Sequence, residues 1–384
     1  MPEAIPFNKP CLAGEELANM AVAVQSGHTS AKGPFSSRAA EILRDAQQAE
    51  DVLLTSSCTD ALEMAAMLVG AGPGDVVIVP SFTFSSTATA FARSGALLRF
   101  CDIEHPTLGL DPDHVAASMS PEVKAIVTVH YAGVASDVDR LLDIGDEWGV
   151  PLIEDNAHGL FATHHDRPLG SFGRMSALSF HETKNFICGE GGAIVLNDPA
   201  DVDAAHMLLD KGTNRRQFLE GLVDKYTWQG PGSSFGMSDL LAAYLVAQLE
   251  ARDRIMAERR RVWMGYAQLL EPVAAKFGIT LPYQPAGATP ADHMFYVLLP
   301  AAGIRHQVIS AMRSDGVHPT FHYVPLHSAP AAATLADRFQ PCPVTDDVSA
   351  RLLRFPFYNE LTDTDIERVV DSFTRAMAGM RVLG

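Results

Sequence analysis

Short apolar runs alternate with longer helix-like stretches through the first two-thirds of the chain. A short, near-continuous apolar run is typical of a strand that is buried on both faces of a parallel sheet. Since parallel strands need helical crossovers between them, the alternation predicts an α/β domain built on a mostly parallel sheet. The seven predicted strands are residues 52–55, 76–79, 97–100, 125–129, 152–154, 177–180 and 193–196.

The pattern changes to a long helical repeat after Ser238, which is placed to cap that helix. The repeat continues into Arg259–Arg261, which we expect on a solvated helix face, and the Pro- and Gly-containing stretch 282–290 ends it. We therefore expect a large domain at 1–250 and a smaller α+β domain at 251–384, with the long helix bridging them. The smaller domain is predicted to contain a strand at 294–299, a helix at 306–315 and a strand at 318–323.

Composition and charge narrow the classes of protein to consider. The chain has 384 residues, 47% of them apolar, and a formal net charge of −17, which argues against a nucleic-acid or anionic-membrane surface. No apolar run approaches the roughly 20 residues that a membrane span needs, and the first residues lack the pattern of a signal peptide. The five cysteines are scattered without a C-x-x-C pair. We therefore expect a cytoplasmic protein without a zinc site.

Two residues that follow predicted strands carry the most specific chemistry. Asp155 ends the strand at 152–154, and Lys184 follows the strand at 177–180. A lysine amine can hold pyridoxal phosphate as a Schiff base, and a carboxylate can keep the pyridinium nitrogen protonated. Each residue alone also fits an ordinary role, as a surface cation or as an aspartate that caps the next helix. Because functional groups gather at the carboxyl ends of parallel strands, the pair predicts a cofactor site there.

Neighbouring segments offer groups for the rest of the cofactor. The stretch 55–64 passes from strand through small polar residues into a helix, which suits a phosphate group as well as an ordinary helix cap. Ser179 adds a hydroxyl. Phe82 and Phe84 follow another strand. If the chain bends at the strand end, one of the two rings faces a planar cofactor ring and the other packs in the core.

The segment 318–327 concentrates three histidines and Tyr323 around two prolines. A metal site and a substrate-facing edge both fit this composition. The prolines and the strand-like alternation favour the edge, so we expect no metal.

Together these motifs resemble the DegT/DnrJ/EryC1/StrS family of sugar aminotransferases over nearly the whole chain. The resemblance implies fold type I of the pyridoxal-phosphate-dependent transferases (aspartate aminotransferase-like) and a homodimer with shared active sites. Four segments (57–66, 180–185, 211–215 and 224–228) are most similar to the subgroup that forms dTDP-4-amino-4,6-dideoxygalactose. The family motifs lie at Pro80–Phe84, Val129–Gly133, Glu154–His158, Ser179–Lys184, Gly189–Gly192 and Pro325–His327.

The resemblance also implies roles for single residues. Lys184 would link covalently to pyridoxal 5'-phosphate, and Asp155 would pair with its ring nitrogen. Phe84 would stack on the ring, while His158 would contact the ring oxygen or merely pack. The phosphate contacts would come from Thr59, Asp60 and Ser179.

Ser234 marks a departure from the wider family pattern. The family commonly has Gly-Tyr-Asn-Tyr-Arg where this chain has Gly232–Gly236, so Ser234 stands where an Asn reaches the partner subunit's phosphate. The serine hydroxyl can make the same contact, and the subgroup also has paired serines there. Substrate contacts are expected at His181, Lys211, Tyr323 and His327.

The implied reaction is transfer of an amino group from L-glutamate to C4 of a nucleotide-linked 4-keto-6-deoxyhexose. Lys184 would release the cofactor to the amino donor and then act as the base that shuttles a proton. The alternatives are a family member that acts on another nucleotide keto-sugar or at C3, and a pyridoxal-phosphate-binding regulator without turnover. A dehydratase of this family would carry His in place of Lys184, which this chain does not.

Overall fold

The computed structural model describes residues 3–381 of the chain. A central sheet contains β1 (Asp51–Thr55), β2 (Val76–Pro80), β3 (Leu97–Cys101), β4 (Val123–Val129), β5 (Leu152–Asp155), β8 (Met175–Ser179) and β9 (Gly192–Leu196). Their order across the sheet is β1-β9-β8-β5-β4-β2-β3. β9 runs antiparallel to both of its neighbours and the other pairs are parallel. The predicted seven-stranded, mostly parallel sheet is confirmed.

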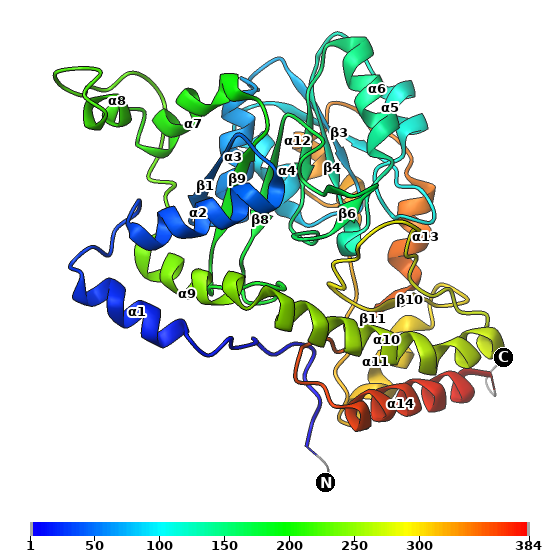
Figure 1. Cartoon of the computed structure of the whole chain (residues 1–384). Helices are drawn as coiled ribbons and strands as arrows, with labels where there is room; N and C mark the ends of the chain where they lie inside the picture. Colours follow the sequence, from blue (N-terminus) through cyan, green and yellow to red (C-terminus); the bar gives the residue numbers. More distant parts are fainter. Residues whose placement is uncertain (1–2, 382–384) are drawn as a thin grey trace.

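Helices cover both faces of this sheet (Figure 1). They are α2 (Pro34–Gln47), α3 (Cys58–Leu68), α4 (Ser85–Ala92), α5 (Pro112–Ser118), α6 (Val138–Trp148), α7 (Val202–Leu209) and α9 (Asp239–Glu250). Because strand side chains alternate between faces, Leu53 packs with α3, α4 and α7, whereas Leu54 packs with α2 and α9. Ile78 packs with α5 and α6 on that second face. Burial on both faces explains why the strands read as apolar runs.

Local sequence signals set the helix ends at the edge of the sheet. The Ser57 hydroxyl caps α3 by accepting a hydrogen bond from the Asp60 amide at 3.0 Å. Ser238 caps α9 in the same way, as predicted, and α9 starts at the next residue. α6 ends at Gly149, whose positive φ of 66° is a conformation that glycine adopts without strain.

The C-terminal third forms a second apolar cluster, which also contains Ile5 from the N-terminal segment. Its elements are α10 (Arg252–Phe277), β10 (Tyr296–Leu298), α11 (Arg305–Ser314), α13 (Pro343–Arg351), β11 (Leu352–Arg354) and α14 (Asp363–Arg381). The predicted strand near 296 and the helix at 306–315 are confirmed. The remaining short elements are β6 (Thr163–His164), β7 (Arg167–Pro168), α8 (Arg215–Leu219) and α12 (Ala332–Leu335).

Three expectations for the chain after Ser238 are wrong. Residues 318–323 form no strand, since only Thr320 makes an isolated bridge, and β10 pairs instead with β11. Pro319 and Pro325 lack the N–H groups that a ladder needs. The solvated face predicted for Arg259 is also wrong, because Arg259 is buried and donates to the carbonyls of Asp292 and His293. The long helical repeat is two helices, which break at Ala251.

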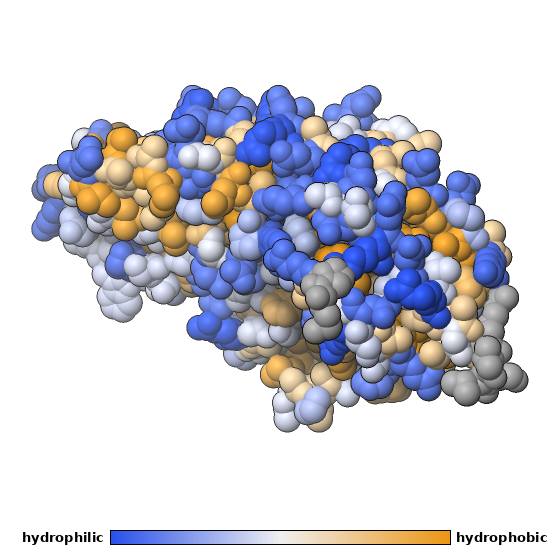
Figure 2. Space-filling model, turned by 90° about the horizontal axis from the view of Figure 1, so that it is seen from below, coloured by the Kyte–Doolittle hydropathy of each residue, from blue (hydrophilic) through white to orange (hydrophobic). Residues whose placement is uncertain are grey.

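α1 (Glu16–Gln25) presents an apolar surface to the outside. Glu16 faces inward, where its carboxylate accepts hydrogen bonds from the amides of Ala13 and Gly14 and from Gln248 of α9. The large side chains Leu17, Val22 and Val24 are exposed, and Figure 2 shows apolar side chains gathered at this end of the molecule. Within residues 3–381, no helix combines the length and apolar character of a membrane span.

Candidate active site

A cavity of about 570 Å³ opens beyond the carboxyl ends of the parallel strands. It is lined by the strand ends and helix starts of the sheet and by the loop that holds Lys184. Phe7 of the N-terminal segment, His293, the segment 320–323 and Arg354 complete the lining. This is the position expected for the functional site of an α/β sheet. Eight of the predicted residues line it: Thr59, Phe84, Asp155, His158, Ser179, His181, Lys184 and Tyr323.

Asp155 is the last residue of β5 and is buried at the floor of this cavity. The Thr87 hydroxyl donates to its Oδ2 at 2.7 Å, and the Ala157 amide donates to Oδ1 at 3.2 Å. Burial raises the pKa of Asp155, while the Thr87 hydrogen bond and the charge of Lys184 act to lower it. A carboxylate held this rigidly can keep a protonated ring nitrogen in one place.

Lys184 lies in the loop between β8 and β9, and its amine reaches the same cavity. Burial of the amine lowers the pKa of Lys184, although the charge of Asp155 acts to raise it. A lower pKa gives a larger neutral fraction, which is the form that attacks a carbonyl or accepts a proton. Asn185, the next residue, fixes the loop by donating to the Ala291 carbonyl at 2.7 Å.

The start of α3 supplies the groups suited to a phosphate. The backbone enters the helix through Ser57, and the Thr59 hydroxyl donates to Ser86 at 2.8 Å. The first amides of a helix lack intrahelical partners and attract anions. A Cβ at Gly192 would lie 2.4 Å from the Cys58 nitrogen, so this close strand-to-turn contact requires glycine. Asp60, predicted at the phosphate, is not among the residues that line the cavity.

Phe84 and His158 present ring surfaces to the cavity. Phe84 is 61% exposed and starts α4, whereas Phe82 is buried against Tyr131 and Tyr323. The two rings therefore point to different surroundings, and Phe84 is the one that faces the cavity. The sequence alone did not decide between them. His158 accepts a hydrogen bond at Nδ1 from the Ala132 amide at 3.3 Å, so the ring proton resides on Nε2.

Burial lowers the pKa of His158 well below its usual range. The ring is therefore neutral and presents one N–H donor, which suits an oxygen acceptor such as the phenolic oxygen of a pyridoxal ring. This geometry supports the predicted contact, although packing is part of the role too, because His158 stacks on His293 at 4.3 Å.

Three predicted residues lie elsewhere. His327 is bonded through Nδ1 to the Ser81 hydroxyl at 2.6 Å and is not among the cavity-lining residues. Lys211 and Ser234 are exposed at the base of the segment 209–235, where the Lys211 amide donates to the Ser233 carbonyl at 3.1 Å. This segment, with α8, projects from one end of the molecule (Figure 1). Their roles stay predictions.

The structure also adds residues that the sequence reasoning missed. Ser86 offers a hydroxyl to the cavity, and His293 and Arg354 line its other side. Ser57 and His322 also line it, and they belong to the stretches 55–64 and 318–327 that the sequence already indicated. A usable signal existed for Arg354, since it is a lone charge inside the apolar run Leu352–Phe357. A surface cluster of Asp139, His164 and His165 could hold a metal ion, and it is separate from the three histidines of 318–327.

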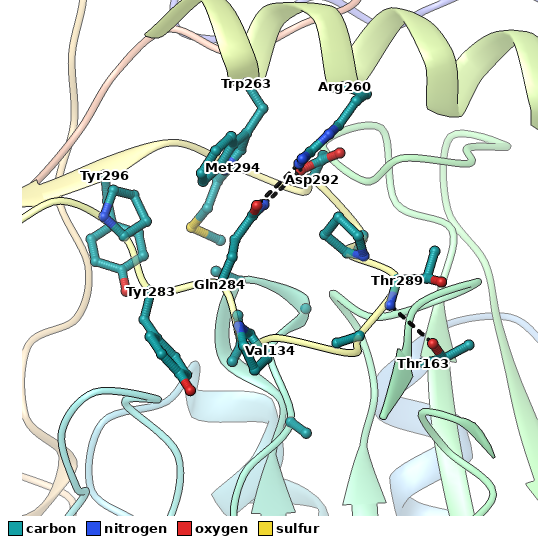
Figure 3. A pocket seen from close by; sticks show the side chains of 18 residues that line it. Val134, Thr163, Arg260, Trp263, Tyr283, Gln284, Thr289, Asp292, Met294 and Tyr296 are labelled. Carbon is teal, nitrogen blue, oxygen red and sulfur yellow. Dashed lines mark hydrogen bonds and ion pairs between the residues drawn. The ribbon is translucent and has the colours of Figure 1, made fainter. Parts of the chain in front are cut away.

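A second cavity, of about 250 Å³, lies between α10 and the loops at 132–135 and 282–292. In Figure 3, Arg260 and Trp263 extend from α10, and dashed lines join Arg260, Gln284 and Asp292. Arg260 donates to the Asp292 carboxylate at 3.1 Å, and Gln284 donates to it at 3.0 Å. Asp292 has a positive φ of 45°, so these contacts hold a strained residue beside His293.

The residues of the large cavity fit pyridoxal 5'-phosphate. A buried carboxylate (Asp155) and a lysine amine of lowered pKa (Lys184) face one space, and the start of α3 offers amides and hydroxyls for a phosphate. Phe84 provides an exposed ring surface and His158 a neutral N–H donor. Each part of the cofactor therefore has a chemically matched group on the chain.

Comparisons with known proteins agree with this fit. The chain is 28% identical over 383 residues to the spore coat polysaccharide biosynthesis protein SpsC of Bacillus subtilis (strain 168), covering 98% of this chain and 97% of that protein. Among solved structures, the aminotransferase TlmJ from Streptoalloteichus hindustanus is 28% identical with a TM-score of 0.89, covering 98% of this chain and 100% of that one.

Two further structures extend the likeness. DesV of S. venezuelae is 27% identical with a TM-score of 0.87, covering 98% of this chain and 99% of that one. The PLP form of Spr1654 from Streptococcus pneumoniae, at 22% identity, shares the fold with a TM-score of 0.89, covering 98% and 99% of the two chains. The model of the DegT/DnrJ/EryC1/StrS aminotransferase family matches residues 10–374. The chain belongs to this family of pyridoxal-phosphate-dependent sugar aminotransferases.

Proposed function

We propose that this enzyme moves an amino group from L-glutamate to C4 of dTDP-4-keto-6-deoxy-D-glucose and so forms dTDP-4-amino-4,6-dideoxy-D-galactose. The observation that carries the transaminase chemistry is the placement of Lys184 and Asp155 in one cavity beside the start of α3. The choice of sugar rests on the resemblance of segments 57–66, 180–185, 211–215 and 224–228 to the subgroup with this substrate.

The bound cofactor supplies an electron-accepting ring that stabilises negative charge on the substrate carbon. Asp155 keeps the ring nitrogen protonated by accepting a hydrogen bond from it. With the cofactor bound, the Lys184 amine would be the base that accepts and returns the proton of the substrate Cα. Its lowered pKa suits a base that works near neutral pH. His158 would offer its Nε2 proton to the ring oxygen, since its Nδ1 already accepts from the Ala132 amide.

Substrate contacts are proposed at His181 and Tyr323, both of which line the cavity. Lys211 and His327 lie outside the cavity lining. They can contact the substrate only if it extends beyond the cavity, as we expect of a nucleotide-linked sugar. The second candidate is a family member that acts on another nucleotide keto-sugar or at C3. The name of the relative SpsC, a polysaccharide biosynthesis protein, is compatible with either sugar.

We also propose a homodimer in which the active sites are shared. The exposed apolar side chains of α1, and Leu219, Leu222, Tyr226 and Trp228 on the projecting segment 209–235, are surfaces that a second copy can cover. Ser234 at the base of this segment would then reach the partner's phosphate site. The five cysteines are free thiols, in keeping with a cytoplasmic enzyme.

The cofactor assignment is tested by absorbance. Purified enzyme incubated with pyridoxal 5'-phosphate should show a band at roughly 400–430 nm from the lysine-bound cofactor. The variant Lys184→Ala should lack this band, whereas Lys225→Ala, which removes an exposed lysine of the segment 209–235, should keep it. An unchanged spectrum in Lys184→Ala would refute the role of Lys184.

The sugar assignment is tested in a half-reaction. Enzyme converted to its amine form with L-glutamate is mixed with candidate keto-sugars, and recovery of the band identifies the amino acceptor. Recovery with dTDP-4-keto-6-deoxy-D-glucose, and a product carrying nitrogen at C4 by NMR, supports the proposal. Recovery only with a 3-keto-sugar or another nucleotide sugar selects the second candidate instead.

A further inference from the structure

Two histidines of the hairpin β6–β7 and an aspartate of α6 bring metal-ligating atoms together away from the large cavity. One ligand atom each from Asp139, His164 and His165 lies within 4.8 Å of the other two. Nε2 of His164 is 3.6 Å from Oδ2 of Asp139, and the centroids of the two imidazole rings are 4.1 Å apart. None of the three residues lines the cavity that holds Lys184. The cluster is therefore separate from the proposed transaminase chemistry.

The turn of the hairpin places both imidazoles together. β6 and β7 pair in antiparallel register, so His165 and Asp166 form a two-residue turn between them. Their φ values are 48° and 62°, the positive values that a type I′ turn requires. Successive side chains of an extended strand point to opposite faces, which would separate the rings of His164 and His165. The left-handed backbone at His165 instead brings its ring beside that of His164.

The cations nearest in sequence are engaged elsewhere, which leaves the carboxylate of Asp139 to the histidines. His164 is the only basic side chain within 4.0 Å of that carboxylate among residues 3–381. Arg140, the next residue, pairs with a different carboxylate at 2.5 Å. Arg167 of β7 donates from Nε to the Ser171 hydroxyl at 3.1 Å. Two imidazoles beside a carboxylate that no lysine or arginine neutralises are a donor set for a divalent cation.

We propose that Asp139, His164 and His165 bind a divalent transition-metal ion, for which Zn²⁺ is the best match. Zinc takes imidazole nitrogen and carboxylate oxygen as ligands, whereas Mg²⁺ and Ca²⁺ prefer oxygen. With bonds of about 2.1 Å, two ligand atoms of a tetrahedral zinc ion lie about 3.4 Å apart. The separation of 3.6 Å between His164 and Asp139 is close to this value. The exposed ring of His165 can turn to complete the set, and water takes the fourth position.

The ion joins α6 to a hairpin that has little support of its own. β6 and β7 have two residues each and form a sheet separate from the central one. A hairpin this short is marginal in water without outside contacts. One such contact is with the loop 282–292, where the Thr163 amide donates to the Thr289 carbonyl and the Thr289 amide to the Thr163 hydroxyl, both at 3.0 Å. A metal bond to Asp139 adds a second attachment, to the first turn of α6.

This donor set contains no cysteine. The sequence argument against a zinc site rested on the scattered cysteines, all five of which are free thiols elsewhere in the fold. Two adjacent histidines gave no signal, because their joint orientation depends on the positive φ of the turn. The aspartate that completes the set belongs to a different element, 25 residues upstream of His164 (164 − 139).

The test measures binding of Zn²⁺ to the cofactor-loaded enzyme by calorimetry, after a chelator has been applied and removed. Wild type should bind one Zn²⁺ per chain that two variants lose. His165→Asn removes an imidazole and keeps the turn, because Asn readily adopts a positive φ. Asp139→Asn removes the carboxylate charge and keeps the shape. Even the outer partners of metal ligands are worth 10- to 100-fold in affinity, so losing a ligand should weaken binding by about 100-fold or more.

Two control variants match these changes in chemistry. His306→Asn removes an exposed imidazole on α11, and Asp143→Asn removes an exposed carboxylate one turn further along α6. Both should bind Zn²⁺ like wild type. The comparison of Asp139 with Asp143 separates direct ligation from the general negative charge of α6. Mg²⁺ in place of Zn²⁺ should bind at least about 100-fold more weakly, because it prefers oxygen ligands.

A second readout follows stability. Zn²⁺ at about 100 times its dissociation constant should raise the melting temperature of wild type by roughly 3 °C. At the same Zn²⁺ concentration, His165→Asn and Asp139→Asn should gain less than about 1 °C. The two control variants should gain as much as wild type. Circular dichroism reports whether each variant is folded before the metal is added.

Loss of binding in both ligand variants, with both controls like wild type, supports the site. Wild type that takes up no Zn²⁺ refutes it. Uptake that His165→Asn and Asp139→Asn leave unchanged also refutes it and assigns the metal to other groups, such as the free thiols. Loss in only one of the two refutes the three-residue donor set, and equal loss in Asp143→Asn refutes direct ligation. No readout uses turnover, so these results are independent of the proposed transaminase function.

Discussion

Replacing Glu154 by Gln should destabilise the enzyme, because it leaves buried hydrogen-bond donors without an acceptor. Glu154 is fully buried in β5, beside Asp155. Its Oε1 accepts hydrogen bonds from the amides of Phe172 at 2.7 Å and Gly173 at 2.6 Å. Its Oε2 accepts from the amide of Gly170 at 2.8 Å and from the His130 imidazole at 2.7 Å.

The His130 contact has a defined direction. The Ser136 amide donates to Nδ1 of His130 at 3.3 Å, so Nε2 carries the proton that reaches Glu154. All four partners of the carboxylate are therefore donors. Gln offers one acceptor oxygen and one NH₂ group, and the NH₂ group must face two of these donors. Two hydrogen bonds to a charged group are lost, which costs about 3–5 kcal/mol.

This free energy translates into a measurable shift of the melting temperature. At roughly 2.1 cal/mol/K per residue, the unfolding entropy of a chain this long is about 0.8 kcal/mol/K, so the melting temperature should fall by roughly 4–6 °C. Thermal unfolding is followed by circular dichroism with saturating cofactor. Glu147→Gln, at an exposed position of α6, is the control and should melt like wild type. A shift below about 1 °C for Glu154→Gln would refute the reasoning, since it would mean that the donors find other acceptors.

Three further predictions concern catalysis, pH and assembly. Asp155→Asn should keep the cofactor band but slow the single-turnover reaction with L-glutamate at least about 100-fold. The control Asp113→Asn, at an exposed position, should react like wild type. Equal rates for the two variants would contradict the proposed contact of Asp155 with the ring nitrogen. Burial acts to raise the pKa of Glu16, but hydrogen bonds from amides and Gln248 outweigh it and lower the pKa, so its stabilisation is present above about pH 4.5 and lost as the pH falls through the lower folded value. Melting temperatures of Glu16→Gln should accordingly lie below wild type at pH 7 and approach it as the pH falls well below 4.5. A difference that stays constant with pH would contradict this prediction. Leu17→Glu should place a charge on the apolar face of α1 and convert the proposed dimer to monomer in analytical ultracentrifugation, whereas an unchanged mass would exclude α1 from the interface.

The sheet was predictable because its physics is local and repetitive. Strands buried on both faces must be apolar along their whole length, so each appears in the sequence as a run such as Ala125–Val129. The helix caps at Ser57 and Ser238 were readable for the same reason, since a hydroxyl and the amide it bonds lie three residues apart. The pairing of Lys184 with Asp155 in one cavity followed from their positions after strands of one sheet.

The C-terminal part depended on contacts that are remote in the sequence. β11 is three residues long and contains Arg354, so no periodicity marks it as a strand. Arg259 is buried because it donates to carbonyls 33 and 34 residues downstream. The run of arginines in the sequence does not indicate these partners. Ser86 was missed for a related reason, because the starts of α3 and α4 come together only when the sheet has assembled.

The segment 291–293 connects α10 with the loop that holds Lys184. Arg259 and Arg260 of α10 hold this segment from one side, and Asn185, adjacent to Lys184, holds it from the other. His293 within it donates through Nδ1 to the side-chain oxygen of Asn185 at 2.8 Å and stacks on His158. α10 and the loop of Lys184 are therefore joined through this one segment. We expect a tilt of the helix against the sheet to shift the proposed base Lys184 and the proposed ring-oxygen donor His158 together.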